Sequence, residues 1–128
     1  MRRLGEPMRL LVCGGRDFED WTWLRQTLDR YADDATVLIC GMATGADLLA
    51  LQWARQKGIE VLEFVPDWKR YGPSAGPIRN LAMLTDGKPD FVVAFPGGRG
   101  TRNMLQLAEN AGIPRLLMRP KGGFGPPV

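Results

Sequence analysis

The chain contains no histidine and only two cysteines, Cys13 and Cys40. Without histidine, the most common general base is missing, and so is every Ser-His or Cys-His nucleophile pair. Two thiols without histidine also argue against a structural zinc site. Any catalysis must therefore come from carboxylates, Arg, Lys, Tyr, a thiol, bound water or the ligand itself. Both cysteines end apolar segments, and we interpret them as buried, inert thiols.

Long apolar runs are also missing. No run is long enough to cross a bilayer, and residues 1–3 are followed by Gly5-Glu6-Pro7 rather than by the apolar region of a signal peptide. We therefore expect a cytoplasmic protein with no membrane partner. The net charge of +3 is small and several basic residues lie near the chain ends, so nucleic acid is not the expected partner. The acidic residues form no close-spaced cluster that would support a magnesium site, and no cofactor is identified.

The bulk composition is that of one ordinary globular domain. The chain has 128 residues, of which 45% are hydrophobic and 24% charged, enough to bury a core without disulfides or metals. Glycine, proline and charged residues gather at both ends. This composition predicts flexible tails over residues 1–7 and 120–128, flanking a single domain over residues 8–119.

Within the domain, short apolar segments alternate with helical patterns. Strands are expected over residues 9–13, 36–40, 60–65, 91–95 and 115–118, helices over 21–31, 46–57, 78–85 and 102–110, and a long loop over 66–77. Near-continuously apolar strands separated by helices are typical of a parallel sheet covered on both faces. With right-handed crossovers, this predicts an α/β, Rossmann-like doubly wound sheet of about five strands in the order 3-2-1-4-5. We expect Asp17 or Asp20 to cap the first helix and Gly58 to end the second.

Two glycine-rich loops follow predicted strands. One is Cys-Gly-Gly-Arg-Asp at residues 13–17, and the other is Pro-Gly-Gly-Arg-Gly-Thr at residues 96–101. A helix beginning at Thr101 would point its unpaired N–H groups and positive dipole end at the second loop, which suits a phosphate. In a 3-2-1-4-5 sheet the chain reverses between strands one and four, where ligands of open α/β sheets bind. The loops therefore predict a nucleotide-type ligand; the alternative is that they are turns that merely need glycine.

Two familiar nucleotide motifs are missing. The glycine loops lack the lysine of a P-loop NTPase. No acidic residue follows the second strand, which ends Cys40-Gly41, so the carboxylate that grips ribose in NAD-dependent oxidoreductases is absent there. Both enzyme classes are disfavoured.

An ordered set of short motifs extends beyond these loops. It comprises residues 13–18 (CGGRDF), 45–47 (GAD), 53–54 (WA), 67–68 (DW), 71–72 (YG), 75–80 (AGPIRN) and 96–101 (PGGRGT). Over most of residues 8–118, this set resembles the YspA-like branch of the SLOG superfamily, which also includes the LOG phosphoribohydrolases and the DNA-processing protein DprA. The resemblance implies a Rossmann-like fold and a nucleotide or nucleotide-derived ligand.

The resemblance also bears on catalysis. LOG-type phosphoribohydrolases pair an arginine with a glutamate that follows the glycine-threonine motif, and Arg79 matches that arginine. The glutamate position falls at Asn103 or Met104, neither of which can act as a carboxylate base. Cys40 also stands where relatives often carry histidine. The resemblance thus implies that nucleotide binding can persist without that hydrolysis.

Several side chains are candidates for ligand contact. The full set is Gly14, Gly15, Arg16, Asp17, Gly45, Asp47, Trp68, Arg79, Asn80, Pro96, Gly97, Gly98, Arg99, Gly100 and Thr101. Arg79 and Asp47 are the candidate catalytic residues within it. Arg79 and Arg99 could clamp phosphate oxygens through their forked donors, although Arg99 and Arg16 fit equally well as solvent-facing residues.

Other members of the set have two interpretations each. Thr101 could donate its hydroxyl to a phosphate or cap the following helix. Asp17 and Asp47 could lie near a sugar or stabilise the adjacent helix starts. Trp68 could stack on a base or pack into the core at the edge of the sheet.

These observations lead to one main hypothesis. The chain binds a nucleotide or ADP-ribose-like ligand at the C-terminal edge of the sheet, as a sensor, a sequestering protein or a hydrolase of an N-glycosidic or phosphoester bond. The alternatives are an active LOG-like nucleoside 5′-monophosphate phosphoribohydrolase and a DprA-like single-stranded DNA-binding protein. A homodimer is compatible with the apolar residues Leu81, Met83, Leu84, Met104 and Leu107, which also fit as core positions.

Overall fold

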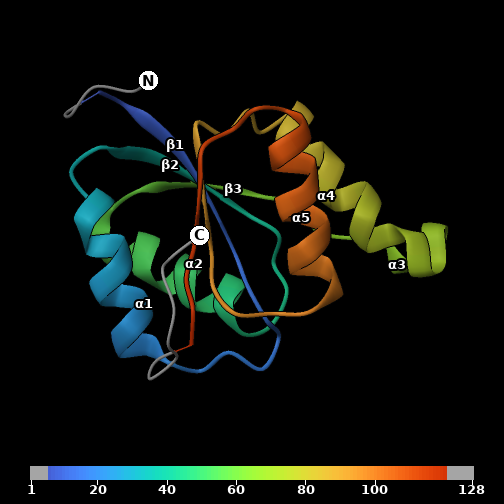
Figure 1. The fold of residues 1–128 in the computed structure, drawn as a ribbon, viewed down its shortest axis with the longest axis horizontal. Coiled ribbons are helices and arrows are strands. Elements are labelled where there is room, and N and C mark those ends of the chain that lie inside the picture. Colours follow the sequence, from blue (N-terminus) through green and yellow to red (C-terminus); the bar gives the residue numbers. More distant parts are fainter. Residues whose placement is uncertain (1–5, 121–128) are drawn as a thin grey trace.

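Parallel strands form the centre of the protein, and helices cover both faces of the sheet (Figure 1). The computed structural model describes residues 6–120. The strands are β1 (Met8–Cys13), β2 (Ala35–Cys40), β3 (Glu60–Glu63), β4 (Phe91–Ala94) and β5 (Arg115–Leu117), and the helices are α1 (Trp21–Leu28), α2 (Ala46–Lys57), α3 (Trp68–Tyr71), α4 (Ala75–Thr85) and α5 (Arg99–Asn110). The strand order is β3-β2-β1-β4-β5, and all neighbouring strands are parallel. The predicted fold class and strand order are confirmed.

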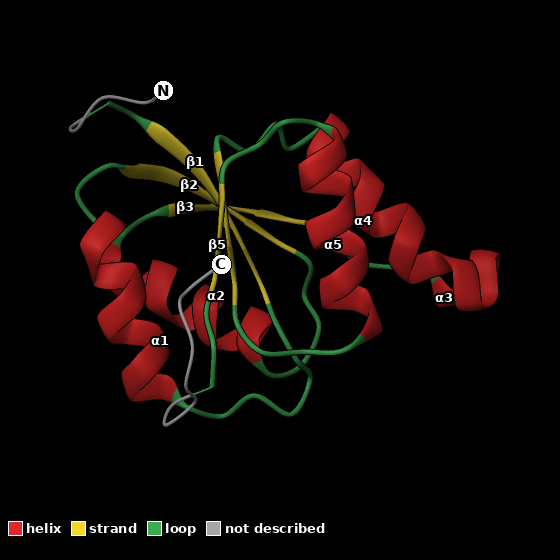
Figure 2. Cartoon of the chain, in the orientation of Figure 1, coloured by secondary structure: helices red, strands yellow, loops and turns green. Residues whose placement is uncertain are grey.

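The central strand β1 separates two apolar layers. Leu10 and Val12 face the layer that contains Leu24 of α1 and Trp53 of α2. Leu11 faces the other layer, together with residues of α4 and α5. This alternation follows from the two-residue period of a strand, and it explains why almost every residue of β1 is apolar. Figure 2 shows α1 and α2 grouped apart from α4 and α5.

The two cysteines lie in different layers. Cys13 belongs to the layer under α4 and α5, and Cys40 belongs to the layer under α1 and α2. Both thiols are free and buried, as expected. Burial raises the pKa of both thiols, that of Cys40 to about 12, so neither ionises readily at neutral pH.

The ends of the first two long helices agree with the sequence signals. The Asp20 side chain accepts a hydrogen bond from the backbone N–H of Trp23, at 3.0 Å, and so caps α1. Gly58 ends α2 in the left-handed conformation, with φ of 70°. Helix α1 is shorter than predicted, because the chain tightens into a 3₁₀ turn over Asp29–Tyr31.

The predicted loop over residues 66–77 is wrong: most of it is helical. Asp67 caps α3 by accepting from the backbone N–H of Arg70, at 3.1 Å. A 3₁₀ turn (Gly72–Ser74) with Pro73 in its first turn leads directly into α4. Pro77 lies in the first turn of α4, where a missing N–H removes no helical hydrogen bond. Prolines that look like helix breakers in the sequence therefore occupy positions that helices tolerate.

The remaining predictions on organisation are partly covered by the structure. The predicted tails, residues 1–7 and 120–128, lie mostly outside the described residues. No helix in residues 6–120 has the length and apolar character needed to cross a bilayer. Of the residues considered for a dimer contact, Met83 and Met104 are buried core residues, whereas Leu81 is exposed.

Candidate functional site

Three strand-to-helix loops meet at the carboxyl edge of the sheet. The Gly15 N–H donates to the Pro96 carbonyl at 2.8 Å, and the Ala46 N–H donates to the Gly15 carbonyl at 3.1 Å. The loops approach so closely that side chains do not fit between them. A Cβ on Gly97 would lie 2.7 Å from Gly15 N, and one on Gly45, whose φ is +80°, would lie 2.1 Å from the Gly15 carbonyl oxygen. Glycine at these positions lets the loops that follow β1, β2 and β4 pack together.

A cavity of about 660 Å³ opens beside this junction. Its lining residues are Cys13, Gly14, Arg16, Ala43, Asp47, Trp68, Pro73, Gly76, Pro77, Arg79, Asn80, Met83, Arg99, Gly100, Thr101 and Asn103. The volume lies in the range of small-molecule sites, and the position is where the strand order reverses.

The cavity contains some of the candidate residues and not others. Those that line it are Gly14, Arg16, Asp47, Trp68, Arg79, Asn80, Arg99, Gly100 and Thr101. Gly15, Gly45, Pro96 and Gly97 instead belong to the loop junction behind it. Asp17 is exposed and is not among the lining residues.

Arg79 reaches into the cavity from α4 and is held by two acceptors. Its Nε donates to Asn80 Oδ1 at 2.9 Å, and its Nη1 donates to the Gly41 carbonyl. These bonds fix the plane of the guanidinium. Its other N–H groups donate to no acceptor within residues 6–120 and can bind a ligand. Partial burial lowers the pKa of Arg79, and the nearby Asp47 carboxylate opposes that shift.

Asp47 lies in the first turn of α2, and the residue is only 6% exposed. One carboxylate oxygen, Oδ2, accepts from the backbone N–H of Ala43 at 3.1 Å. Burial raises the pKa of Asp47 to about 6, although the Ala43 hydrogen bond and the charges of Arg79 and Arg16 act in the opposite direction. Asp47 is therefore a buried carboxylate whose environment compensates its charge incompletely.

Asp47 and Arg79 face each other across a gap. The point that a Cβ on Gly41 would occupy is 3.0 Å from both Asp47 Oδ2 and Arg79 Nη1. Among the salt bridges of the described residues, none joins these two side chains. The arrangement places an acceptor and a cationic donor side by side, each with capacity for a further partner.

The first turn of α5 forms another wall of the cavity. Helix α5 begins at Arg99 rather than at residue 102, and its N-cap is Gly98, which provides no side-chain cap. The interpretation of Thr101 as the cap is therefore wrong; Thr101 lies inside the first turn and is buried. Within the described residues, the backbone N–H groups of Arg99, Gly100 and Thr101 donate to no backbone carbonyl. Such groups attract an anion.

Asn80 connects Arg79 to this helix. Its Nδ2 donates to the Gly100 carbonyl at 3.1 Å and to Asn103 Oδ1 at 2.9 Å, while its Oδ1 accepts from Arg79. Asn80 is buried, and all three bonds link groups on the cavity wall. Asn103 is thus the residue that faces the cavity, whereas Met104 points into the core.

An aromatic ring also lines the cavity. Trp68 is 47% exposed and lines the cavity, so its interpretation as a core residue is wrong. The Arg16 guanidinium carbon lies 5.7 Å from the centre of the Trp68 ring, a cation–π contact. Trp53, by contrast, is fully buried between α2 and the sheet, as expected of a packing residue.

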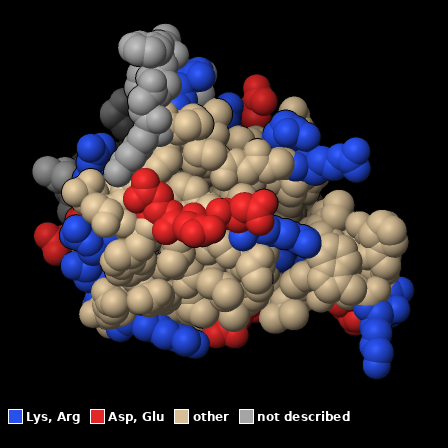
Figure 3. Space-filling model, turned by 90° about the horizontal axis from the view of Figure 1, so that it is seen from below, with Lys and Arg blue, Asp and Glu red and all other residues tan. Residues whose placement is uncertain are grey.

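The face of the molecule seen from below Figure 1 carries charges of both signs. Figure 3 views the molecule from below Figure 1 and shows a row of acidic side chains beside basic ones on that face. A continuous basic surface, as found in many nucleic-acid-binding proteins, is not seen in this view. Among residues 6–120, no group of three or more Cys, Asp or Glu side chains is arranged to hold a metal ion.

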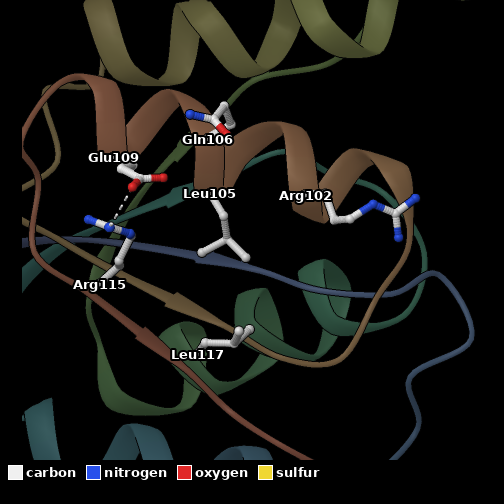
Figure 4. Close-up of a pocket in the computed structure, with 6 residues that line it drawn as sticks. All are labelled: Arg102, Leu105, Gln106, Glu109, Arg115 and Leu117. Atoms are coloured by element: carbon white, nitrogen blue, oxygen red, sulfur yellow. Dashed lines mark ion pairs between the residues drawn. The ribbon is translucent and has the colours of Figure 1, made fainter. Parts of the chain in front are cut away.

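A second hollow lies between α5 and the edge strand β5 (Figure 4). It measures about 490 Å³ and is lined by Arg102, Leu105, Gln106, Glu109, Arg115 and Leu117. Two of its charged residues, Arg115 and Glu109, approach each other to 3.9 Å. The glycine loops contribute nothing to it, and of the first turn of α5 only Arg102 lines it, so the larger cavity is the better candidate site.

Sequence reasoning missed two contributors to the site, because both act through backbone atoms. The Gly41 carbonyl holds Arg79, and the Ala43 N–H holds Asp47. One signal was available: both residues lie in the loop that follows β2, at the edge where the other loops were expected to meet.

Comparisons with known proteins agree with this fold. The model of the YspA, cpYpsA-related SLOG family matches residues 8–71, which include Asp47 and Trp68 but end before Arg79 and α5. The Gene 61 protein of Mycobacterium phage D29 is 38% identical over 117 residues, covering 83% of this chain and 92% of that protein.

A solved structure gives the same architecture. DNA processing protein A (DprA) from Streptococcus pneumoniae superposes with a TM-score of 0.74 at 17% identity, covering 91% of this chain. The match covers 52% of the DprA chain, so the present chain spans about half of its length. At this identity the likeness concerns the fold alone. The family match and the phage relative lead to one conclusion: the chain belongs to the YspA, cpYpsA-related SLOG family.

Proposed function

We propose that the chain binds a nucleotide or a nucleotide-derived, ADP-ribose-like ligand in the cavity at the carboxyl edge of the sheet. The observation that carries this proposal is the convergence of the Arg79 guanidinium and the free first-turn amides of α5 on one cavity. Both groups favour an anion, and the cavity has the volume of a small-molecule site.

The phosphate of such a ligand would lie against the start of α5. The backbone N–H groups of Arg99, Gly100 and Thr101 supply donors there, and the helix dipole adds partial positive charge. Gly98 and Gly100 leave open space beside the backbone, since a Cβ on either would meet no atom within 4 Å. An anion can therefore approach the amides closely.

The base of the ligand would lie toward α3 and α4. Trp68 presents an exposed aromatic ring to the cavity, and Pro77 and Met83 add apolar surface. A planar heterocycle can stack on such a ring. The Arg16 side chain already contacts the Trp68 ring, and a stacked base would compete with or extend that contact.

Hydrolysis in the manner of LOG enzymes has weaker support. Of the two positions where the resemblance places the glutamate of those enzymes, Asn103 lines the cavity, and its Oδ1 accepts from Asn80. An amide cannot act as a carboxylate base. The proposal is therefore binding, as a sensor or a sequestering protein; hydrolysis and the binding of single-stranded DNA stay alternative predictions.

Isothermal titration calorimetry tests the proposal directly. The wild-type protein is titrated with AMP, ADP-ribose, NAD and a cyclic nucleotide, and then the best ligand is titrated into the Arg79→Gln variant. Loss of the guanidinium should weaken binding by roughly tenfold to a hundredfold, because it removes a charge-assisted donor from the cavity.

Two further variants make the result specific. Arg55→Gln removes an exposed arginine on α2 that pairs with Glu63 outside the cavity, so it should leave the affinity unchanged. Arg99→Gln removes an exposed cavity arginine, so it should weaken binding without disturbing the core. Failure of every nucleotide to bind the wild type, or equal losses in the Arg55 and Arg79 variants, would contradict the proposal.

A further inference from the structure

The Asp47 carboxylate has one oxygen that the protein leaves free. Oδ2 accepts from the Ala43 N–H, but no hydrogen bond from residues 6–120 reaches Oδ1. In residues 6–120, every side-chain oxygen or nitrogen that is fully inaccessible to solvent has a hydrogen-bond partner. Since Oδ1 has none, it must be accessible, and Asp47 lines the cavity. A buried carboxylate oxygen that faces a cavity needs a hydrogen-bond donor from whatever fills it.

The charges of the cavity walls separate the two ends of a bound ligand. Asp47 belongs to α2, and the amides belong to α5. The β1–α1 loop lies between these two helix starts, because Gly15 in that loop is hydrogen-bonded to Ala46 on one side and to Pro96 on the other. A phosphate is attracted by the start of α5 and repelled by the Asp47 carboxylate. The part of the ligand beside Asp47 must therefore be a neutral donor rather than an anion.

The planar base is the less suitable donor to Asp47, because a different wall of the cavity offers an aromatic ring on which the base can stack. The exposed ring of Trp68 approaches Gly76 closely: a Cβ on Gly76 would lie 3.5 Å from the Trp68 ring atom Cη2. This wall comes from α3 and α4, whereas Asp47 comes from the start of α2. With the phosphate at α5 and the base at Trp68, the sugar is the part left to face Asp47.

On the basis of the proposed function, we infer that Asp47 Oδ1 accepts a hydrogen bond from a ribose hydroxyl and makes the cavity selective for ribose over deoxyribose ligands. A site built to bind a hydroxyl rejects the analogue that lacks it, because the buried acceptor is then left unpaired. Arg79, beside Asp47, can donate to the oxygen of the same or the neighbouring hydroxyl. Asp47 is thus a specificity-determining residue for the sugar.

The test compares matched ligands by calorimetry at pH 7.5. Wild-type protein is titrated with AMP, 2′-deoxy-AMP, 3′-deoxy-AMP and ribose 5-phosphate. AMP and ribose 5-phosphate should both bind, and at least one deoxy analogue should bind about tenfold more weakly than AMP, or worse. In the Asp47→Asn variant, Ala43 N–H still orients the side-chain oxygen, so an amide NH₂ faces the cavity in place of Oδ1. The AMP-to-deoxy ratio should then fall to within about twofold.

A matched carboxylate serves as the control. Asp17→Asn makes the same charge change on the neighbouring loop, outside the cavity, and should keep the wild-type ratio. Asp47→Ala provides a second variant without any acceptor at the position. An unchanged ratio in both Asp47 variants would overturn the inference.

The ligand series also separates this inference from the proposed function. Equal binding of AMP and both deoxy analogues by the wild type overturns the role of Asp47 and leaves nucleotide binding standing. The same holds if ADP-ribose or NAD binds while AMP and ribose 5-phosphate do not. If no nucleotide binds, the proposed function fails, and the inference fails with it.

Discussion

The two ends of helix α2 are built in opposite ways. At the C-terminal end, Gly58 takes the left-handed conformation with open space where a Cβ would lie, and the Lys57 ammonium lies 3.3 Å from Asp29. At the N-terminal end, Gly45 also has a positive φ, but the loop after β1 lies directly against it. No side chain caps that end, and a carboxylate is buried in its first turn. One end follows the usual rules of helix stability and the other does not.

The two carboxylates near these ends show the same contrast. Asp29 accepts a hydrogen bond from Trp53 Nε1 at 2.9 Å, which is the main reason that its pKa is lowered; Lys57 and Arg25 contribute further. Asp47 has a raised pKa, mainly because burial disfavours its charge. The fold thus stabilises the charged form of Asp29 and destabilises the charged form of Asp47.

This difference indicates what each end of α2 is for. A buried, poorly compensated charge lowers the stability of the folded state, and such charges gather at functional sites. The N-terminal end of α2 carries that cost next to Arg79 and the candidate cavity. The C-terminal end of α2, as the structure describes it, buries no charged side chain. Matched mutations at the two ends of α2 therefore test whether the ends differ in this way.

The largest effect is expected from a methyl group at the crowded glycine. In Gly45→Ala, the new Cβ would lie 2.1 Å from the Gly15 carbonyl oxygen in a backbone conformation that L-residues avoid. The free energy of unfolding should fall by at least about 3 kcal/mol, or the protein should fail to fold. Urea denaturation followed by circular dichroism measures this loss.

Gly58→Ala is the matched control at the other end. Its φ of 70° is similar, but a Cβ there meets no atom within 4 Å. Only the backbone strain remains, so the loss should be about 1 kcal/mol. Equal losses for the two variants would show that the loop junction does not require the close approach.

The second effect concerns the charge of Asp47. The pKa of Asp47 is raised from 3.8 to about 6, so the charged carboxylate destabilises the folded state at neutral pH by about 2–3 kcal/mol. The folded state binds the proton more tightly than the unfolded state. Stability from this group is therefore fully present below pH 3.8 and is lost as pH rises through about 6.

Asp47→Asn should consequently stabilise the protein at pH 7.5 by about 2–3 kcal/mol, with the advantage shrinking as pH falls toward 4.5. Urea denaturation of both proteins at several pH values measures the difference. The chain has no histidine, so few other side chains titrate in this range. Asp17→Asn, at an exposed carboxylate, should change stability at pH 7.5 by no more than about 0.5 kcal/mol. A stabilisation by Asp47→Asn that did not vary with pH would contradict the explanation.

The fold could be predicted to the level of strand order, because the signals for it are local. The strands are short apolar runs and the helices have periodic apolar faces, so alternation alone specifies a parallel sheet. Helices α3 and the start of α4 could not be recognised. Proline is common in loops and also in the first turns of helices. Pro73 and Pro77 therefore do not distinguish the two in the sequence, and only the structure shows which position each occupies.

The position of the candidate site could be predicted from the sequence, but the roles of its individual residues could not. Both glycine loops were placed at the same edge, and the structure joins them through Gly15 and Pro96. Asp17 and Asp47 each follow a strand and precede or begin a helix, so sequence position does not distinguish them. Burial does, and it depends on how the loop after β2 packs against α4. The anchors of Asp47 and Arg79 are main-chain groups, which carry no signature in residue type.

The smallest effect is expected at Asp29, where the sign of the pH dependence reverses. In Asp29→Asn, Trp53 Nε1 keeps an acceptor but loses a charged one, and Lys57 loses its ion pair. The side chain of Asp29 is 31% exposed, so solvent screens these interactions and the loss at pH 7.5 should be only about 1 kcal/mol.

Because the pKa of Asp29 is lowered in the folded state, its contribution is present above the ordinary carboxyl pKa and is lost as pH falls through the lowered value. Raising the salt concentration to about 1 M should also reduce the loss. Urea denaturation of the wild type, Asp29→Asn and Lys57→Met, with the double variant, measures the coupling. A stabilising effect of Asp29→Asn at neutral pH, like that expected for Asp47→Asn, would mean that the two ends of α2 do not differ in the way their charges suggest.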